Sequence, residues 1–372
     1  MTVFDVPLDR LYQRRSMKWR RYPAAVLPLW VAEMDTYLPA AVRAAVAEAV
    51  DLGDFGYHGP GLLEPAWARY ARDTWGLELA TRQIALTLDV VGAMTNAVAY
   101  LTPPDAAIAF TTPIYPPFRD AATVGGRRAV TVDQTPEGRL DLAALERLFA
   151  TERPALFLLC NPDNPHGTIA TRAELEAVAA LGRTYGVRIL VDEIHGLVHR
   201  ADAEFTPYLA VTGSETGLVA TSASKGFGLA GLKAGLLIAG PAATDQLQRL
   251  PYEAMAGSAG HLALIAQTAA LDGARDWLAD MNAEVVANKA LLAELLAPLG
   301  LAYEPSPATY FAWVDCSVLG LPDPTDHFLR EGAVAFNPGW SYDPRFGQWT
   351  RINVATSPAV LREAVRRVAT TL

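Results

Sequence analysis

The chain has 372 residues, which exceeds the size of one ordinary hydrophobic core, so we expect two domains. Hydrophobic residues make up 51% and charged residues 19% of the sequence, a balance typical of a globular enzyme. The net charge of −9 argues against nucleic acid as a partner, because phosphate binding depends on clustered Lys and Arg.

Targeting and redox signals favour the cytoplasm. The basic N-terminal segment is not followed by the apolar stretch of a secretory signal, and no apolar run approaches the roughly 20 residues that span a bilayer. We therefore expect no membrane association. Cys160 and Cys316 lie in apolar, strand-like runs without CxxC spacing, so two buried free thiols are expected rather than a disulfide or a zinc site.

The first two thirds of the chain predict an alternation of strands and helices. Residues 1 to about 35 are expected to form an irregular arm, and a helix is predicted over 39–52, with Pro39 near its start and Gly53 after its end. Near-continuous apolar strands separated by helices indicate a mainly parallel sheet covered on both faces. The other predicted helices span 62–75, 94–101, 142–149 and 172–185, and the predicted strands span 106–110, 128–132, 155–160, 187–191, 217–221 and 234–238.

The pattern changes after about residue 260, where 261–296 is largely helical and strands are predicted at 310–315 and 351–355. This arrangement predicts an α/β protein with a large domain and a smaller α+β C-terminal domain. We assign residues 1–40 to an N-terminal arm that packs with the small domain, 41–265 to the large domain and 266–372 to the small domain.

Lys225 and Asp192 are the most informative residues of the chain. Lys225 lies among small residues, where it can lose solvation and become a nucleophilic amine. Asp192 follows the predicted strand 187–191, and a carboxylate in that place can hold a ring nitrogen protonated. A Schiff-base lysine and an acidic partner for a pyridinium are the two parts of a pyridoxal 5′-phosphate (PLP) site. Taken alone, Asp192 also fits a helix N-cap or a surface carboxylate.

The segment Gly226–Gly231 formally matches GxGxxG, the dinucleotide-binding fingerprint. It lies in mid-chain, a strand follows almost at once, and the acidic residue of such a site is missing, so we reject this match as a dinucleotide-binding site. The glycines instead let the backbone pass close to Lys225 and a phosphate. Candidate phosphate ligands are Lys233, the Ser222 hydroxyl and the backbone amides of Val91, Gly92 and Ala93, where a helix is predicted to start.

Four further residues complete the candidate site. Asn164 lies in a proline-rich turn after strand 155–160, from which its amide can donate to a phenolate oxygen. Tyr115 can stack on a ring, and Arg351 offers a two-pronged donor for a substrate carboxylate. His195 either reaches the cofactor or satisfies a loop carbonyl. Each of these residues also fits an ordinary loop, core or surface role, so the assignment depends on the whole set.

Together these residues resemble the fold type I PLP-dependent enzymes of the class I and II aminotransferase superfamily. Over nearly its whole length the chain is most similar to the MalY/PatB-type cystathionine β-lyases, which are C–S lyases. The motifs that carry the resemblance are Ser16–Trp19, Leu27–Asp35, Phe55–Tyr57 and Asp192–His195. The resemblance implies a fold type I PLP-dependent transferase, in which a mainly parallel seven-stranded sheet covered by helices is joined to a smaller α+β C-terminal domain.

The resemblance also implies how the cofactor is held. Lys225 would form the Schiff base with PLP, and Asp192 would pair with the pyridine nitrogen. Asn164 would contact the ring oxygen O3′, and His195 would lie close to that oxygen. Tyr115 would stack on the ring.

The substrate and the neighbouring subunit enter the site by the same resemblance. Arg351, together with Asn164, would hold the substrate α-carboxylate. Tyr57 would reach the phosphate in the neighbouring subunit, which implies a homodimer with active sites at the subunit interface. Lys225, Tyr57 and Tyr115 form the expected catalytic set.

The expected activity is β-elimination from a sulfur amino acid. L-Cystathionine or a related cysteine S-conjugate would give pyruvate, ammonia and a thiol, which is homocysteine in the case of cystathionine. Departures from the usual motifs of the group, such as Glu33 in place of Asp and Gly226 in place of Thr, leave the substrate open. The alternatives are transamination of L-amino acids on the same fold and a regulatory role through protein interaction. A third is a nicotinamide oxidoreductase, which binding of NAD without PLP would reveal.

Overall fold

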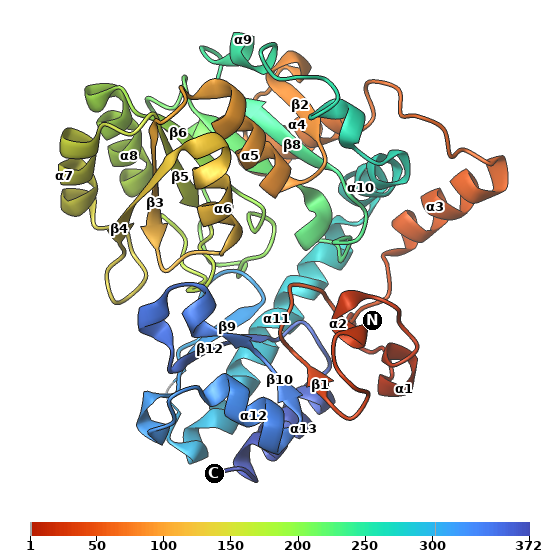
Figure 1. Ribbon diagram of the computed structural model, residues 1–372. Helices are drawn as coiled ribbons and strands as arrows, with labels where there is room; N and C mark the ends of the chain where they lie inside the picture. Colours follow the sequence, from red (N-terminus) through yellow and green to blue (C-terminus); the bar gives the residue numbers. More distant parts are fainter. Residues whose placement is uncertain (1, 302) are drawn as a thin grey trace.

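The computed structural model describes residues 2–301 and 303–372. Its larger part is built on a seven-stranded sheet in the order β2-β8-β7-β6-β5-β3-β4, in the upper half of Figure 1. Within this sheet β8 is antiparallel to both neighbours and the other strands are parallel, so the predicted fold class is confirmed. The strands are β2 (Ile84–Thr87), β3 (Ala107–Thr112), β4 (Arg128–Asp133), β5 (Leu156–Cys160), β6 (Arg188–Asp192), β7 (Leu218–Thr221) and β8 (Gly235–Ala239). The helices beside them are α5 (Val90–Leu101), α6 (Pro117–Thr123), α7 (Leu142–Glu152) and α8 (Arg172–Tyr185).

The five inner strands of the sheet, β3, β5, β6, β7 and β8, are buried on both faces, which explains why they are largely apolar. The edge strand β4 is only partly buried. Successive side chains of a strand point to opposite faces. In β5, Leu156 and Leu158 pack in the core that contains α5 and α6, whereas Phe157 and Leu159 pack in the core that contains α7 and α8. A strand that is buried on both faces shows no alternation of apolar and polar residues, so it appears in the sequence as a continuous apolar run. Such runs predicted these strands correctly.

The C-terminal part contains a three-stranded antiparallel sheet in the order β11-β12-β9. The helical stretch predicted over 261–296 forms two helices, because Ala274 leaves the helical conformation with φ −130°. The elements of this part are α10 (His261–Gly273), α11 (Arg275–Leu296), β9 (Phe311–Asp315), α12 (Pro324–Gly332), β10 (Val334–Ala335), β11 (Asn337–Pro338), β12 (Trp349–Asn353) and α13 (Pro358–Ala369).

The N-terminal arm is more ordered than the expected irregular segment. Its strand β1 (Leu27–Pro28) pairs in parallel with β10, and Figure 1 shows the arm beside the C-terminal helices. This pairing joins the arm to the C-terminal part of the chain, and the division into an arm, a large domain and a small domain stays a prediction. The other helices of the first 250 residues are α1 (Leu8–Leu11), α2 (Met17–Arg20), α3 (Ala40–Leu52), α4 (Leu63–Trp75) and α9 (Thr244–Leu247).

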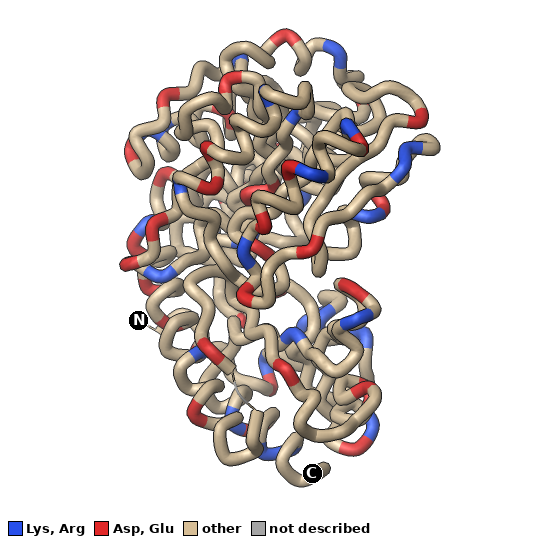
Figure 2. The backbone as a smooth tube through the Cα atoms, turned by 90° about the vertical axis from the view of Figure 1, so that its left-hand side faces the viewer, with Lys and Arg blue, Asp and Glu red and all other residues tan. Residues whose placement is uncertain are grey.

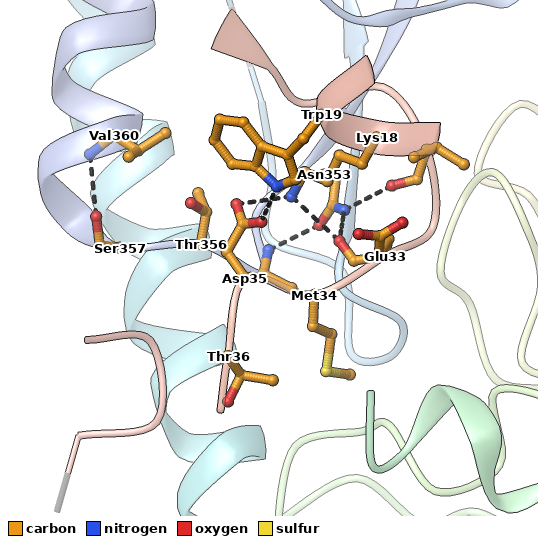
Figure 3. A network of polar contacts seen from close by, with 12 residues as sticks. Lys18, Trp19, Glu33, Met34, Asp35, Thr36, Asn353, Thr356, Ser357 and Val360 are labelled. Carbon is orange, nitrogen blue, oxygen red and sulfur yellow. Dashed lines mark hydrogen bonds and ion pairs between the residues drawn. The ribbon is translucent and has the colours of Figure 1, made fainter. Parts of the chain in front are cut away.

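A buried ion pair joins the arm to the segment Leu29–Thr36, which we call the 29–36 strip. Lys18 Nζ lies 2.7 Å from Asp35 Oδ2, and the two side chains are 0% and 1% exposed. The indole Nε1 of Trp19 donates to Asp35 Oδ1 at 3.0 Å, so the carboxylate has a donor on each oxygen. Figure 3 shows Lys18 and Trp19 converging on Asp35.

The 29–36 strip is also held from the C-terminal part of the chain. Asn353 Nδ2 donates to the carbonyl oxygens of Val31 and Glu33 at 2.7 and 2.8 Å. The Asp35 amide donates to the carbonyl of Ala355 at 2.9 Å. The strip is therefore fixed between two parts of the chain that are more than 300 residues apart in sequence.

Charged residues of both signs are spread over the molecule. Figure 2 shows segments with Lys or Arg lying among segments with Asp or Glu in both halves of the tube. Many of these charges form exposed pairs such as Arg330–Asp326, whose side chains are 70% and 43% exposed. None of the helices formed by residues 2–301 and 303–372 combines the length and the apolar character that a bilayer crossing requires.

We predict that Lys18→Met lowers the free energy of unfolding by about 3–5 kcal/mol, because it leaves the Asp35 carboxylate buried without its cation. Urea unfolding of both proteins measures this difference. The matched control is Arg330→Met, which breaks an exposed pair and is expected to cost at most about 1 kcal/mol. Equal losses in the two variants would contradict a special role for the buried pair.

Candidate active site

A cavity of about 130 Å³ lies where several elements converge at the carboxyl ends of the parallel strands. Its wall includes Asp192 at the end of β6, Asn164 in the turn after β5 and Lys225 in the 3₁₀ turn after β7. The start of α5 and Ala32 of the 29–36 strip close it. Open α/β sheets bind ligands at this edge, so the place of the cavity agrees with the sequence prediction.

Lys225 is held inside the cavity wall with its amine directed at a backbone carbonyl. Its Nζ donates to the carbonyl oxygen of Ala32 at 2.9 Å. Burial lowers the pKa of Lys225 to about 8, and the positive charges of Arg351 and Lys233 act in the same direction. A substantial fraction of this amine is therefore neutral near physiological pH, as a nucleophile or proton acceptor requires.

Asp192 lines the same cavity and is 3% exposed. Its Oδ1 accepts a hydrogen bond from the Ile194 amide at 2.9 Å. Burial raises the pKa of Asp192 to about 7, against the opposing effects of that hydrogen bond and of Lys225. A cation placed against this carboxylate would stabilise its ionised form and reverse the shift.

Arg351 and Asn164 meet at one side of the site. Arg351 Nη1 donates to Asn164 Oδ1 at 3.1 Å, and Arg351 Nη2 donates to the carbonyl of Trp30 at 2.9 Å. The guanidinium carbon lies 3.8 Å from the centre of the Phe311 ring. Arg351 is buried, and its Nε has no partner within the described residues. A buried guanidinium with a free N–H is suited to bind a carboxylate.

His195 and Tyr115 also line the cavity. The His195 ring packs against Tyr310 and Phe311, with ring centres 6.1 and 5.5 Å away. Burial lowers the pKa of His195 well below its usual value, so the ring is neutral at physiological pH. Its Nδ1 is buried and has no partner among the residues that the structure describes. Burial raises the pKa of Tyr115, which therefore keeps its phenolic proton.

The predicted phosphate ligands are only partly available. Lys233 lines the cavity, but its Nζ donates to Asp89 Oδ2 at 2.8 Å. The Gly92 amide donates to Asp89 Oδ1 at 2.8 Å, and the Ala93 amide donates to the Asp89 carbonyl at 2.9 Å. Val91 also lines the cavity. Asp89, which the sequence analysis did not select, is thus the N-cap of α5 and a neighbour of the predicted phosphate site.

Two predicted residues are placed differently from the rest. Ser222 borders the cavity, but its hydroxyl donates to the Ala234 carbonyl at 2.8 Å and is therefore engaged in a hydrogen bond within the protein. Tyr57 is fully exposed and does not line the cavity of its own chain. Their roles toward PLP stay predictions.

Sequence reasoning missed three contributors to the site, for different reasons. Asp89 directly precedes a helix, which is an N-cap signal that the prediction did not use. Ala32 contributes a backbone carbonyl, which no side-chain pattern reveals. Asn353 acts through the 29–36 strip, a contact between residues far apart in the chain.

Both cysteines are free and buried, as the sequence predicts. Cys160 lies at the end of β5 and borders the cavity. Burial and the neighbouring carboxylates of Asp192 and Asp163 raise the pKa of its thiol well above the usual value. Burial also raises the pKa of Cys316, to about 12. Neither sulfur is a thiolate at neutral pH.

The lowered pKa of Lys225 can be measured in cofactor-free protein. The chain has four lysines, so acetylation at Lys225 can be followed by peptide mass spectrometry as pH is raised. We predict a half-maximal rate near pH 8 for Lys225, against about 10.4 for free Nα-acetyl-lysine added as the reference. Asp192→Asn should lower the midpoint further, because the Asp192 charge raises the pKa of Lys225. A wild-type midpoint equal to that of the reference would contradict the prediction.

Comparison with known proteins places the chain in a family. The sequence profile "Aminotransferase class I and II" matches residues 29–368. A Mycobacterium leprae protein named as a candidate cystathionine β-lyase is 38% identical, over 99% of this chain and 97% of that protein. The cystathionine β-lyase of Corynebacterium glutamicum is 30% identical, over 98% and 99% of the two chains. The crystal structure of a candidate PLP-dependent β-cystathionase from Corynebacterium diphtheriae superposes with a TM-score of 0.94 at 32% identity, covering 100% of this chain and 99% of that one. The resemblance inferred from the sequence is confirmed: the chain belongs to the aminotransferase class I and II family.

Proposed function

We propose that this chain is a PLP-dependent C–S β-lyase that converts L-cystathionine, or a related cysteine S-conjugate, to pyruvate, ammonia and a thiol. The observation that carries the proposal is one cavity lined by both a partly buried amine, Lys225, and a buried acid, Asp192. Relatives named for cystathionine β-lyase activity match nearly the whole chain at 30% and 38% identity, which supports the same reaction class.

The residues of the cavity fit PLP. Asp192 is an acid whose pKa is raised by burial, and a protonated ring nitrogen placed against it would stabilise its ionised form. The unpartnered Nδ1 of His195 and the Asn164 side chain offer polar contacts to the ring, and Tyr115 offers a stacking face. Lys225 would bond to the cofactor's aldehyde carbon. Candidate phosphate ligands remain Lys233, Ser222 and the amides of Val91, Gly92 and Ala93.

PLP bound in this cavity would supply an acceptor for the electron pair that remains when the Cα–H bond breaks. The protein's own residues position the substrate and move the proton. Arg351, fixed by Asn164 and the Trp30 carbonyl, binds the α-carboxylate. The Lys225 amine removes the Cα proton, which its lowered pKa permits near neutral pH. The β-thiolate then leaves and takes up a proton to become the thiol. One water is consumed as the remaining three-carbon fragment is hydrolysed to pyruvate and ammonia.

Transamination is the second candidate, because the matching family takes its name from aminotransferases. The same Lys225 amine would then return the proton to the cofactor instead of allowing the β-thiolate to leave. The geometry of the cavity serves both reactions, so the products decide between them.

We predict that the purified full-length protein with PLP releases pyruvate, ammonia and free thiol from L-cystathionine in equal amounts. Replacement of the base, Lys225→Ala, should lower turnover by at least about 10²–10⁴-fold. Arg330→Met, a substitution on the surface, is the matched control and should keep wild-type turnover.

The products separate the candidate functions. If an added 2-oxo acid yields a new amino acid while L-cystathionine yields neither pyruvate nor thiol, the protein is an aminotransferase and the lyase proposal is wrong. Full turnover by Lys225→Ala would contradict its role as the base.

We also propose a homodimer in which Tyr57 completes the site of the partner subunit. Tyr57 and Phe55 lie in an exposed loop, and their side chains are left uncovered in the single chain. Large exposed aromatic residues favour burial against another protein surface. The proposed division of each subunit is an arm (1–40), a large domain (41–265) and a small domain (266–372).

Mixing two inactive variants tests whether Tyr57 acts across subunits. If it does, Tyr57→Ala and Lys225→Ala subunits that exchange freely should recover about a quarter of wild-type activity, because each mixed dimer has one intact site. The measurement is turnover before and after mixing. No recovery, although mass spectrometry detects mixed dimers, would contradict a site shared between subunits.

A further inference from the structure

The carboxylate of Asp89 lies among the groups that are predicted to hold the cofactor's phosphate. Its Oδ1 accepts a hydrogen bond from the Gly92 amide at 2.8 Å. Its Oδ2 lies 2.8 Å from the Lys233 ammonium. Asp89, Val91 and Lys233 all line the cavity that contains Lys225. An anion of the chain itself therefore uses two of the predicted phosphate donors.

Asp89 carries its negative charge at neutral pH. Partial burial alone would raise the pKa of the Asp89 carboxyl, but the hydrogen bonds from Lys233 and Gly92 outweigh burial and hold the pKa below its usual value. The nearby charge of Lys225 acts in the same direction. A phosphate dianion entering this region would meet a like charge at close range, and a single ammonium would have to serve both anions.

We propose that Asp89 acts as an internal competitor of the phosphate group and thereby sets the protein's affinity for PLP. The inference rests on the proposed function and concerns a residue to which the site prediction gave no role. In the absence of the cofactor, Asp89 neutralises Lys233 and caps α5. When PLP binds, Lys233 turns from Asp89 to the phosphate or bridges both anions. The weakened contact between Lys233 and Asp89 then reduces the free energy gained from the contact between Lys233 and the phosphate.

The proposal predicts an effect that depends on the phosphate and not on the rest of the cofactor. Pyridoxal has the same ring and aldehyde as PLP but lacks the phosphate. Removal of the Asp89 charge should therefore strengthen the binding of PLP and leave the binding of pyridoxal nearly unchanged. A general change in the cavity or in the reactivity of Lys225 would alter the binding of both compounds alike.

The experiment measures dissociation constants of PLP and pyridoxal for full-length protein freed of cofactor, by the absorbance change that follows their reaction with Lys225. The variant is Asp89→Asn, whose amide oxygen can still accept from the Gly92 amide. We expect PLP to bind at least about tenfold more tightly than to wild type, which is about 1.4 kcal/mol. Pyridoxal should change by less than about twofold, well below that difference.

A second N-cap provides the matched control. Asp141 caps α7 and accepts from the Ala144 amide at 2.9 Å, the same contact as in Asp89 but outside the cavity. Asp141→Asn should leave both dissociation constants unchanged. Asp89→Ser keeps a good capping residue without the charge, and it should reproduce the preference for PLP if Asp89→Asn folds poorly.

The outcomes distinguish the inference from the proposed function. Unchanged or weaker PLP binding by folded Asp89→Asn and Asp89→Ser overturns the inference, as does an equal gain for PLP and pyridoxal. In both cases wild type still reacts with PLP, so the proposed function stands. Failure of wild type to react with either compound overturns the proposed function and the inference together.

Discussion

The buried ion pair between Lys18 and Asp35 fixes the backbone segment against which the active-site cavity is built. Two desolvated charges are stable inside a protein only when they are paired and their remaining donors and acceptors are satisfied. The Trp19 indole and the carbonyl of Glu33 meet that condition. With the 29–36 strip in place, the carbonyl of Ala32 receives the Lys225 amine. The carbonyl of Trp30 likewise receives the Arg351 guanidinium.

The chemistry of the cavity depends on the exclusion of water. Loss of water raises the pKa of a buried acid and lowers the pKa of a buried amine. It raises the pKa of Asp192 to about 7 and lowers the pKa of Lys225 to about 8. The pKa of each group is thereby brought close to neutral pH, so a small change in its surroundings alters its charge. A cationic ring against the acid would compensate the desolvation cost of its charge. A carbonyl compound that reacts with the amine would remove the amine's charge altogether.

Much of the fold could be predicted because local signals coincide with tertiary structure. The helix α8 begins and ends where it was expected, since Thr171 and Glu174 form a capping box and Gly186 adopts a left-handed conformation. The apolar strands likewise fixed the place of Asp192 at the end of β6. The edge strand β2 was missed, because four residues are too short a run for a pattern to stand out.

Most of the residues predicted for the site line one cavity with Lys225, and their roles stay predictions. The contacts within that cavity depend on pairings that sequence patterns do not encode. The carbonyl of Ala32 belongs to the backbone, and Asn353 reaches the cavity only through the strip it supports. Asp89 carries a local capping signal, yet its pairing with Lys233 joins residues 144 positions apart. Patterns find residue types at strand ends, whereas long-range pairing decides which donors remain free.

The burial of both cysteines has a consequence for an enzyme whose proposed product is a thiol. Disulfide exchange requires an accessible thiolate, and neither Cys160 nor Cys316 provides one in the folded chain. A disulfide formed by later oxidation of the released thiol therefore has no accessible protein thiolate with which to exchange. For the same reason a chromogenic disulfide reagent added to the native protein would report the liberated thiol alone, so that catalysis could be followed continuously without a background from the catalyst.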